Sequence, residues 1–164
     1  MLFKNRIFTF VSIIICALLI SSCETEESLR RIAEVVAYEN FEAYEEDFNR
    51  IKDLVVRTGG DSYYIYKDPI CLRYSKETFG ELIEVDLNDE QAQSIYNIIS
   101  NSIDGRMDRI FVDENRVYFS NGSGSESIVG CGVMYTENVD NVKKKNQNNT
   151  QYVHLDGNWY AVIA

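Results

Sequence analysis

The sequence predicts an α+β fold, in which an antiparallel sheet carries two helices packed on one face. Two observations support this prediction. After residue 23, apolar residues recur at helical spacing in only two segments, and the strand-like segments around them are joined by tight-turn signals instead of regular crossover helices. The expected order of elements is therefore α-βββ-α-βββββ, with no internal repeats.

The first helix is expected over residues 29–57. Five apolar residues recur there at alternating spacings of three and four, which places them on one helix face: Phe41, Tyr44, Phe48, Ile51 and Val55. An earlier apolar set is out of phase with these five and consists of Leu29, Ile32 and Val36. The change of phase predicts a bend, or a change of buried face, near Asn40. Gly59-Gly60 supplies the helix stop.

Three strands are expected next, with the turn Asp68-Pro69 joining the first two, and they cover residues 63–67, 70–75 and 82–87. Asn88 and Gln91 then match a capping box that begins the second helix, which ends at Gly105. The remaining strands follow in hairpins at 109–112, 116–119, 127–136, 151–155 and 159–164. The polar segments 121–126 and 137–150 are expected to be loops. Gly130 and Gly132 flank Cys131 and indicate a close approach by another group.

The first 22 residues have the layout of a signal peptide. Lys4 and Arg6 precede an apolar run over residues 7–20, whose 14 residues fall short of the roughly 20 that a membrane-spanning helix needs. The next residues, Ile20-Ser21-Ser22-Cys23, resemble the lipobox of bacterial lipoproteins. The resemblance implies cleavage after Ser22, lipid on the Cys23 thiol, and a place in the bacterial cell envelope, with the outer membrane favoured if the cell is Gram-negative.

The expected mature chain has a lipidated tether over residues 23–28 and a single domain over residues 29–164. Cleavage removes two basic residues and no acid, so the charge changes from −10 for the whole chain to −12. Such a charge disfavours nucleic acid and anionic lipid surfaces, and it favours either solubility or a basic protein partner. Cys71 and Cys131 are then the only cysteines besides the lipidated one, which predicts a disulfide between them; the alternative is a thiol nucleophile or redox site.

Strand alternation predicts an aromatic row on one face of the sheet. If Ile65 and Ile110 point toward the helices, then Tyr64, Tyr66, Phe111 and Tyr118 point away from them. We refer to these four residues as the tyrosine face. Such a row is typical of a contact surface, because tyrosine buries area while keeping a polar tip. The alternative is that a second layer, a curled sheet or a long loop covers this face.

Catalytic chemistry is poorly supported by the sequence. His154 is the only histidine, and no nucleophile motif, nucleotide-binding loop or zinc pattern accompanies it, so no cofactor, metal or catalytic residue is assigned. The acids Asp86, Asp89 and Glu90 are more simply explained by the start of a helix. The leading hypothesis is a membrane-anchored binding module of the immunity, inhibitor or envelope-accessory kind. The alternative is a carboxylate-dependent envelope hydrolase.

Overall fold

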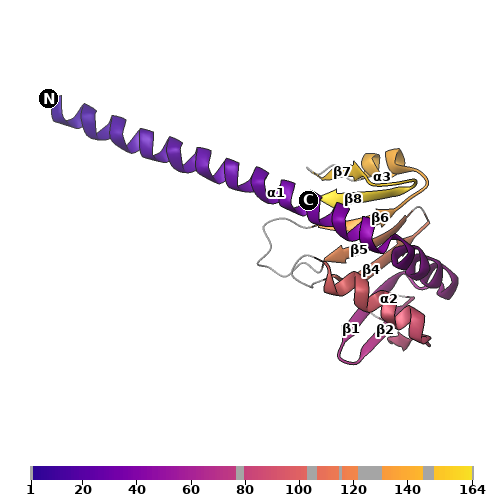
Figure 1. Cartoon of the computed structure of the whole chain (residues 1–164). Coiled ribbons are helices and arrows are strands. Elements are labelled where there is room, and N and C mark those ends of the chain that lie inside the picture. Colours follow the sequence, from indigo (N-terminus) through magenta and orange to yellow (C-terminus); the bar gives the residue numbers. More distant parts are fainter. Residues whose placement is uncertain are drawn as a thin grey trace.

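The computed structural model describes residues 2–76, 80–102, 107–114, 116–121, 131–145 and 150–163, with residues 2–26, 121 and 145 described by their backbone alone. The fold is α+β, and the predicted order of helices and strands is confirmed, with one additional short helix (Figure 1). In chain order the elements are α1 Leu2–Thr58, β1 Ser62–Lys67, β2 Ile70–Ser75, β3 Ile83–Glu84, α2 Asp89–Ser100, β4 Met107–Asp113, β5 Arg116–Asn121, β6 Cys131–Tyr135, α3 Val139–Lys145, β7 Gln151–His154 and β8 Trp159–Ile163. Gly105, Gly130 and most of the predicted loop 121–126 lie outside the described residues.

The strands of the described part form one eight-stranded antiparallel sheet in the order β3-β2-β1-β4-β5-β6-β8-β7. Most neighbours in the sheet are also neighbours in the chain, as the hairpin signals predicted. One exception is the pairing of β1 with β4, because β2, β3 and α2 lie between these two strands in the chain. The other is the placement of β8 between β6 and β7. The last hairpin therefore folds back so that β8, and not β7, extends the sheet from β6.

Helix α1 bends four residues later than predicted and buries a different N-terminal face. Its non-helical backbone is at Tyr44, with φ −132° and ψ 26°. Before the bend, Ala33, Ala37 and Phe41 face the sheet, whereas Ile32, expected to be buried, is 58% exposed. Small side chains are buried on this part of α1 because Ala33 lets the helix lie close to Cys131 and Ile163, at the ends of β6 and β8.

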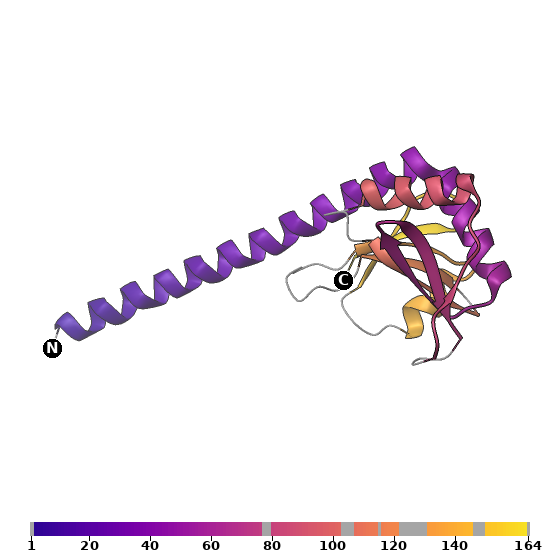
Figure 2. The ribbon, with the colours of Figure 1, turned by 90° about the horizontal axis from the view of Figure 1, so that it is seen from below.

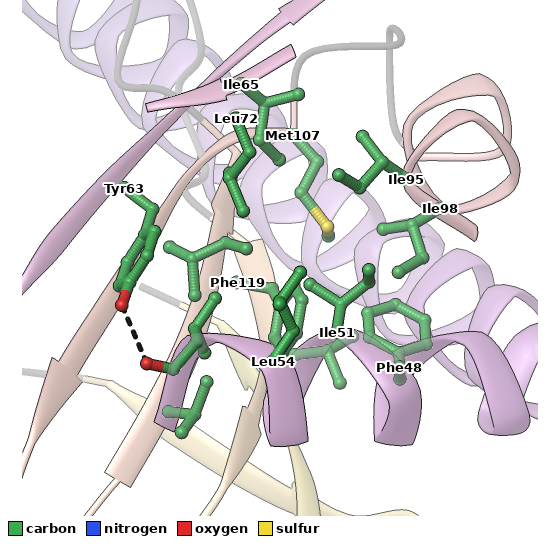
Figure 3. Packing of buried hydrophobic residues seen from close by; sticks show 14 of the residues in the cluster. Phe48, Ile51, Leu54, Tyr63, Ile65, Leu72, Ile95, Ile98, Met107 and Phe119 are labelled. Atoms are coloured by element: carbon green, nitrogen blue, oxygen red, sulfur yellow. Dashed lines mark hydrogen bonds between the residues drawn. The ribbon is translucent and has the colours of Figure 1, made fainter. Parts of the chain in front are cut away.

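The core lies between the sheet and the helices α1 and α2. Phe48 of α1 is fully buried, and its ring centroid lies 5.1 Å from that of Phe119 in β5 and 5.8 Å from that of Trp159 in β8. Ile95 and Ile98 of α2 complete the layer beside them (Figure 3). The predicted helix face of residues 41–55 is therefore the one that joins both halves of the sheet.

Hydrogen bonds stabilise the start of α2 and the end of α1. The capping box that begins α2 is confirmed, because the Gln91 backbone N–H donates to Asn88 Oδ1 over 2.9 Å, and the Gln91 side chain accepts from the Asn88 N–H over 3.0 Å. At the end of α1, the Tyr63 hydroxyl donates to the Val55 carbonyl over 2.7 Å (Figure 3). The same hydroxyl accepts from the Gly60 N–H over 2.8 Å. A buried tyrosine thus satisfies two backbone groups where the helix stops.

The short helix α3 lies on the other side of the sheet from α1 and α2 (Figure 2). Its Val142 is buried against Met134 of β6 and Val162 of β8, and Val139 packs beside them. The segment 137–150 was expected to be a loop, so this part of the prediction is wrong over Val139–Lys145. A second layer therefore exists, and it lies over the β6–β8–β7 end of the sheet.

Candidate functional site

The tyrosine face lies where strand alternation predicted it. Ile65, Ile110 and Phe119 are buried under the helices, so their strand neighbours point to the opposite side, which we call the far face. Phe111 of β4 lies directly opposite Tyr118 of β5. Their rings stack with centroids 6.4 Å apart and planes 20° from parallel. The aromatic rings are thus in contact between β4 and β5, whereas Tyr64 of β1 lies beside Arg109 of β4.

Two arginines that the sequence analysis did not single out lie among these rings. Tyr64 of β1 is paired with Arg73 of β2 on one side and with Arg109 of β4 on the other. The Arg109 guanidinium lies 5.6 Å from the Tyr64 ring centroid, and that of Arg73 lies 5.0 Å from the ring of Tyr66. Cation–π contacts of this kind stabilise exposed sites by about 0.5–1 kcal/mol each.

The signal for these arginines was present in the same alternation that revealed the tyrosines. Arg73 follows buried Leu72, and Arg109 precedes buried Ile110, so each must face away from the helices. Arg109 is exposed, and Arg73 is held by Glu84 of β3 through an ion pair of 3.2 Å. The face therefore offers guanidinium donors, phenol hydroxyls and aromatic rings together, which are the groups that dominate protein contact energies.

The four aromatic residues are not equally accessible. Tyr66 is 40% exposed, while Tyr64 and Phe111 are half-buried. Tyr118 packs against the cluster that α3 completes, and burial raises the pKa of its hydroxyl above the ordinary value. The far face is thus covered at one end and open at the other. The second layer reaches Tyr118, while Tyr66 and Arg109 are open to solvent.

The absence of a side chain at Gly132 makes room for the Tyr118 ring. A Cβ atom at Gly132 would lie 2.5 Å from Cε2 of Tyr118 and 2.3 Å from the Phe119 carbonyl oxygen. The close approach predicted at the glycines around Cys131 is therefore confirmed at Gly132. Without a side chain at Gly132, the Tyr118 ring can approach β6 and pack against the cluster that contains Val142 of α3.

The predicted disulfide between Cys71 and Cys131 is wrong. Cys71 lies on β2 and Cys131 on β6, which are four strand spacings apart, or about 19 Å. A disulfide needs Cα atoms within about 7 Å. The two thiols also point to opposite faces, because Cys131 packs against Ala33 of α1 while Cys71 is paired with Tyr66 on the far face. Counting cysteines could not reveal this separation, which the strand order creates.

The histidine and acids considered for catalysis are dispersed. His154 is exposed, and its Nε2 lies 3.0 Å from the Gly157 carbonyl oxygen in the same hairpin. Its ring packs edge-on against Tyr160. Asp89 and Glu90 are exposed in the first turn of α2, where they complement the helix dipole. Within the described residues these groups form no acid–base pair.

The lipid anchor at Cys23 remains a prediction, since the structure describes only the backbone of this residue, within α1. Among the residues whose side chains the structure describes, no helix is long and apolar enough to cross a membrane. Comparison of the chain with family models, curated proteins and solved structures finds no match.

Proposed function

We propose that the chain is a lipoprotein of the bacterial cell envelope whose domain is a binding module for another protein. The observation that carries this proposal is the exposed part of the far face, where Tyr64 and Tyr66 alternate with Arg73 and Arg109. Tyrosine and arginine are enriched among the residues that contribute most to protein interfaces. Their arrangement on paired strands holds them rigid, so little side-chain entropy is lost when a partner binds.

The chemistry of the face favours a partner that brings acceptors and apolar groups. Arg109 is exposed and can donate to a carboxylate or a backbone carbonyl, while the tyrosine rings bury apolar area beside it. The large negative charge of the whole chain acts at longer range and speeds the approach of a basic protein. Such a partner would contact this face through its own acidic or neutral residues.

The anchor is tested by replacing the lipidated residue. Cys23→Ser in the full chain should abolish incorporation of labelled palmitate, because a hydroxyl does not replace the thiol in the lipid-transfer reaction. Globomycin should cause the wild-type precursor to accumulate. The measurement is autoradiography of the immunoprecipitated protein from both strains. Palmitate that persists on the serine variant would show that Cys23 is not the lipidated residue.

The binding face is tested by photocrosslinking in living cells. Benzoylphenylalanine replaces Tyr66 on the far face or, as a matched control, Tyr96, which is 54% exposed on α2. We expect a discrete adduct with one envelope protein from position 66 and none from position 96. Arg109→Ala should lower the yield of that adduct about tenfold, the loss typical of a residue central to an interface.

The outcome is read by mass spectrometry of the adduct and by its yield on gels. Tyr118 is left unchanged, since its packing against the α3 cluster would confound a loss of contact with a loss of fold. Equal adducts from positions 66 and 96, or none from either, would contradict the proposed face.

A further inference from the structure

A groove lies on the helix side of the sheet, between the last turns of α1 and the adjoining ends of β4, β5 and β6. Its volume is about 410 Å³, within the range of sites that hold a small ligand or a few side chains. Apolar side chains from four elements line it, and they are Val56 of α1, Val112 of β4, Val117 of β5 and Tyr135 of β6. Val56 is 55% exposed there, so an apolar contact is available on one wall. We call it the hairpin groove.

The rim of the hairpin groove is acidic. Asp113, Glu114 and Glu137 line it, and Arg116, the one base among the described residues of the lining, is bound to Asp113 by an ion pair of 2.8 Å. Glu114 and Glu137 are exposed, and in the described part of the chain neither has an ion-pair partner. Three acids and one base in the described lining give it a net charge of −2 beside the apolar side chains, and the Lys52 ammonium lies nearby, over the Tyr135 ring.

We propose that the hairpin groove binds a basic segment of a partner protein, in which a lysine or arginine is flanked by apolar residues. The apolar part of such a segment would cover Val56 and Val112, and its cationic end would reach Glu114 and Glu137. Lysine and arginine suit this shape because their aliphatic stems bury on apolar surface while their charges stay in solvent. The site is distinct from the tyrosine face, which lies on the opposite side of the sheet.

A cation of the chain itself already uses one wall of this region. The Lys52 ammonium lies 4.4 Å from the ring centroid of Tyr135 and 3.2 Å from a carboxylate oxygen of Asp53. An aromatic ring beside acidic groups is thus a stable place for an ammonium in this protein. That same Tyr135 ring forms part of the groove wall, and Glu137 lies beside it in the lining.

The test titrates the full chain, held in detergent micelles, with the peptide acetyl-Val-Lys-Val-Arg-Val-amide and with its counterpart carrying glutamate at both charged positions. Calorimetry should detect the basic peptide and not the acidic one. The double variant Glu114→Gln/Glu137→Gln should lower the affinity for the basic peptide about tenfold and reduce the salt dependence of that affinity. Val56→Ser should weaken it several-fold through lost apolar contact.

Two control variants locate the effect. Glu39→Gln/Glu42→Gln removes two exposed acids from α1 and should change the affinity less than twofold. Tyr66→Ala, on the far face, should leave it unchanged, so this test is independent of the proposed partner-binding face. Absence of binding by the basic peptide, equal binding of both peptides, or an affinity that both glutamine double variants lower equally would overturn the proposal.

Discussion

Phe48→Ala should lower the free energy of unfolding by about 4 kcal/mol, which is a large share of the 5–15 kcal/mol that stabilises a domain of this size. Phe48 is fully buried and touches rings from both ends of the core, with Phe41 at 5.8 Å and Phe119 at 5.1 Å between centroids. Truncation leaves a cavity between α1 and the sheet that these rigid rings cannot fill. Urea unfolding measures the loss through Trp159, the only tryptophan, whose ring lies 5.8 Å from that of Phe48.

Two variants show whether the loss comes from the cavity. Phe48→Leu keeps most of the volume and should cost about 1–2 kcal/mol. Tyr96→Ala removes an aromatic ring of similar size from an exposed position and should cost less than about 0.5 kcal/mol. Equal shifts of the urea midpoint in Phe48→Ala and Tyr96→Ala would mean that the α1–sheet layer does not stabilise the fold.

Gly132→Ala should destabilise the domain by about 3 kcal/mol, although it adds only one methyl group. The new Cβ would lie 2.3 Å from the Phe119 carbonyl oxygen, which belongs to the neighbouring strand of the sheet and cannot move without disturbing the β5–β6 pairing. The Tyr118 ring, at 2.5 Å, would have to lift away from β6 at the same time. Thermal unfolding, followed by circular dichroism, measures the combined cost.

Gly157→Ala is the matched control for that substitution. Gly157 has a positive φ of 53°, but a Cβ there meets no atom within 4 Å. Only the backbone preference opposes alanine at this turn, at about 1–2 kcal/mol. If Gly132→Ala proves no more destabilising than Gly157→Ala, the tight contact between β5 and β6 described here does not exist.

The parts of the fold that could be predicted depend on short-range patterns. The capping box at Asn88, the hairpin turns and the alternation that separates Ile65 from Tyr64 each need only a few neighbouring residues to be recognised. Helix α3 could not be found this way. Its seven residues are mostly polar, and it is stabilised by packing of Val142 on Met134, a contact that exists only after the sheet has formed.

The candidate site was predicted as to side but not as to composition. The two-residue period of a strand is enough to place Tyr66 and Ile65 on opposite faces of the sheet. The order of the strands, however, decides which residues from other strands lie beside Tyr66. That order brings Arg73 and Arg109 next to the tyrosines, and it also holds Cys71 far from Cys131. Pairing between distant strands is a property of the whole chain, and no local motif in this sequence specifies it.

The placement of α1 on the last strands also determines when the domain can fold. Phe41 packs on Trp159 with centroids 5.4 Å apart, and Asn49 accepts a hydrogen bond from the Trp159 indole over 3.3 Å. Part of the apolar face of α1 is therefore covered only by residues that come more than a hundred positions later in the chain. Contacts of such long range slow folding and leave unassembled chains prone to aggregate. Newly made chains should consequently depend on a chaperone until β8 has been completed.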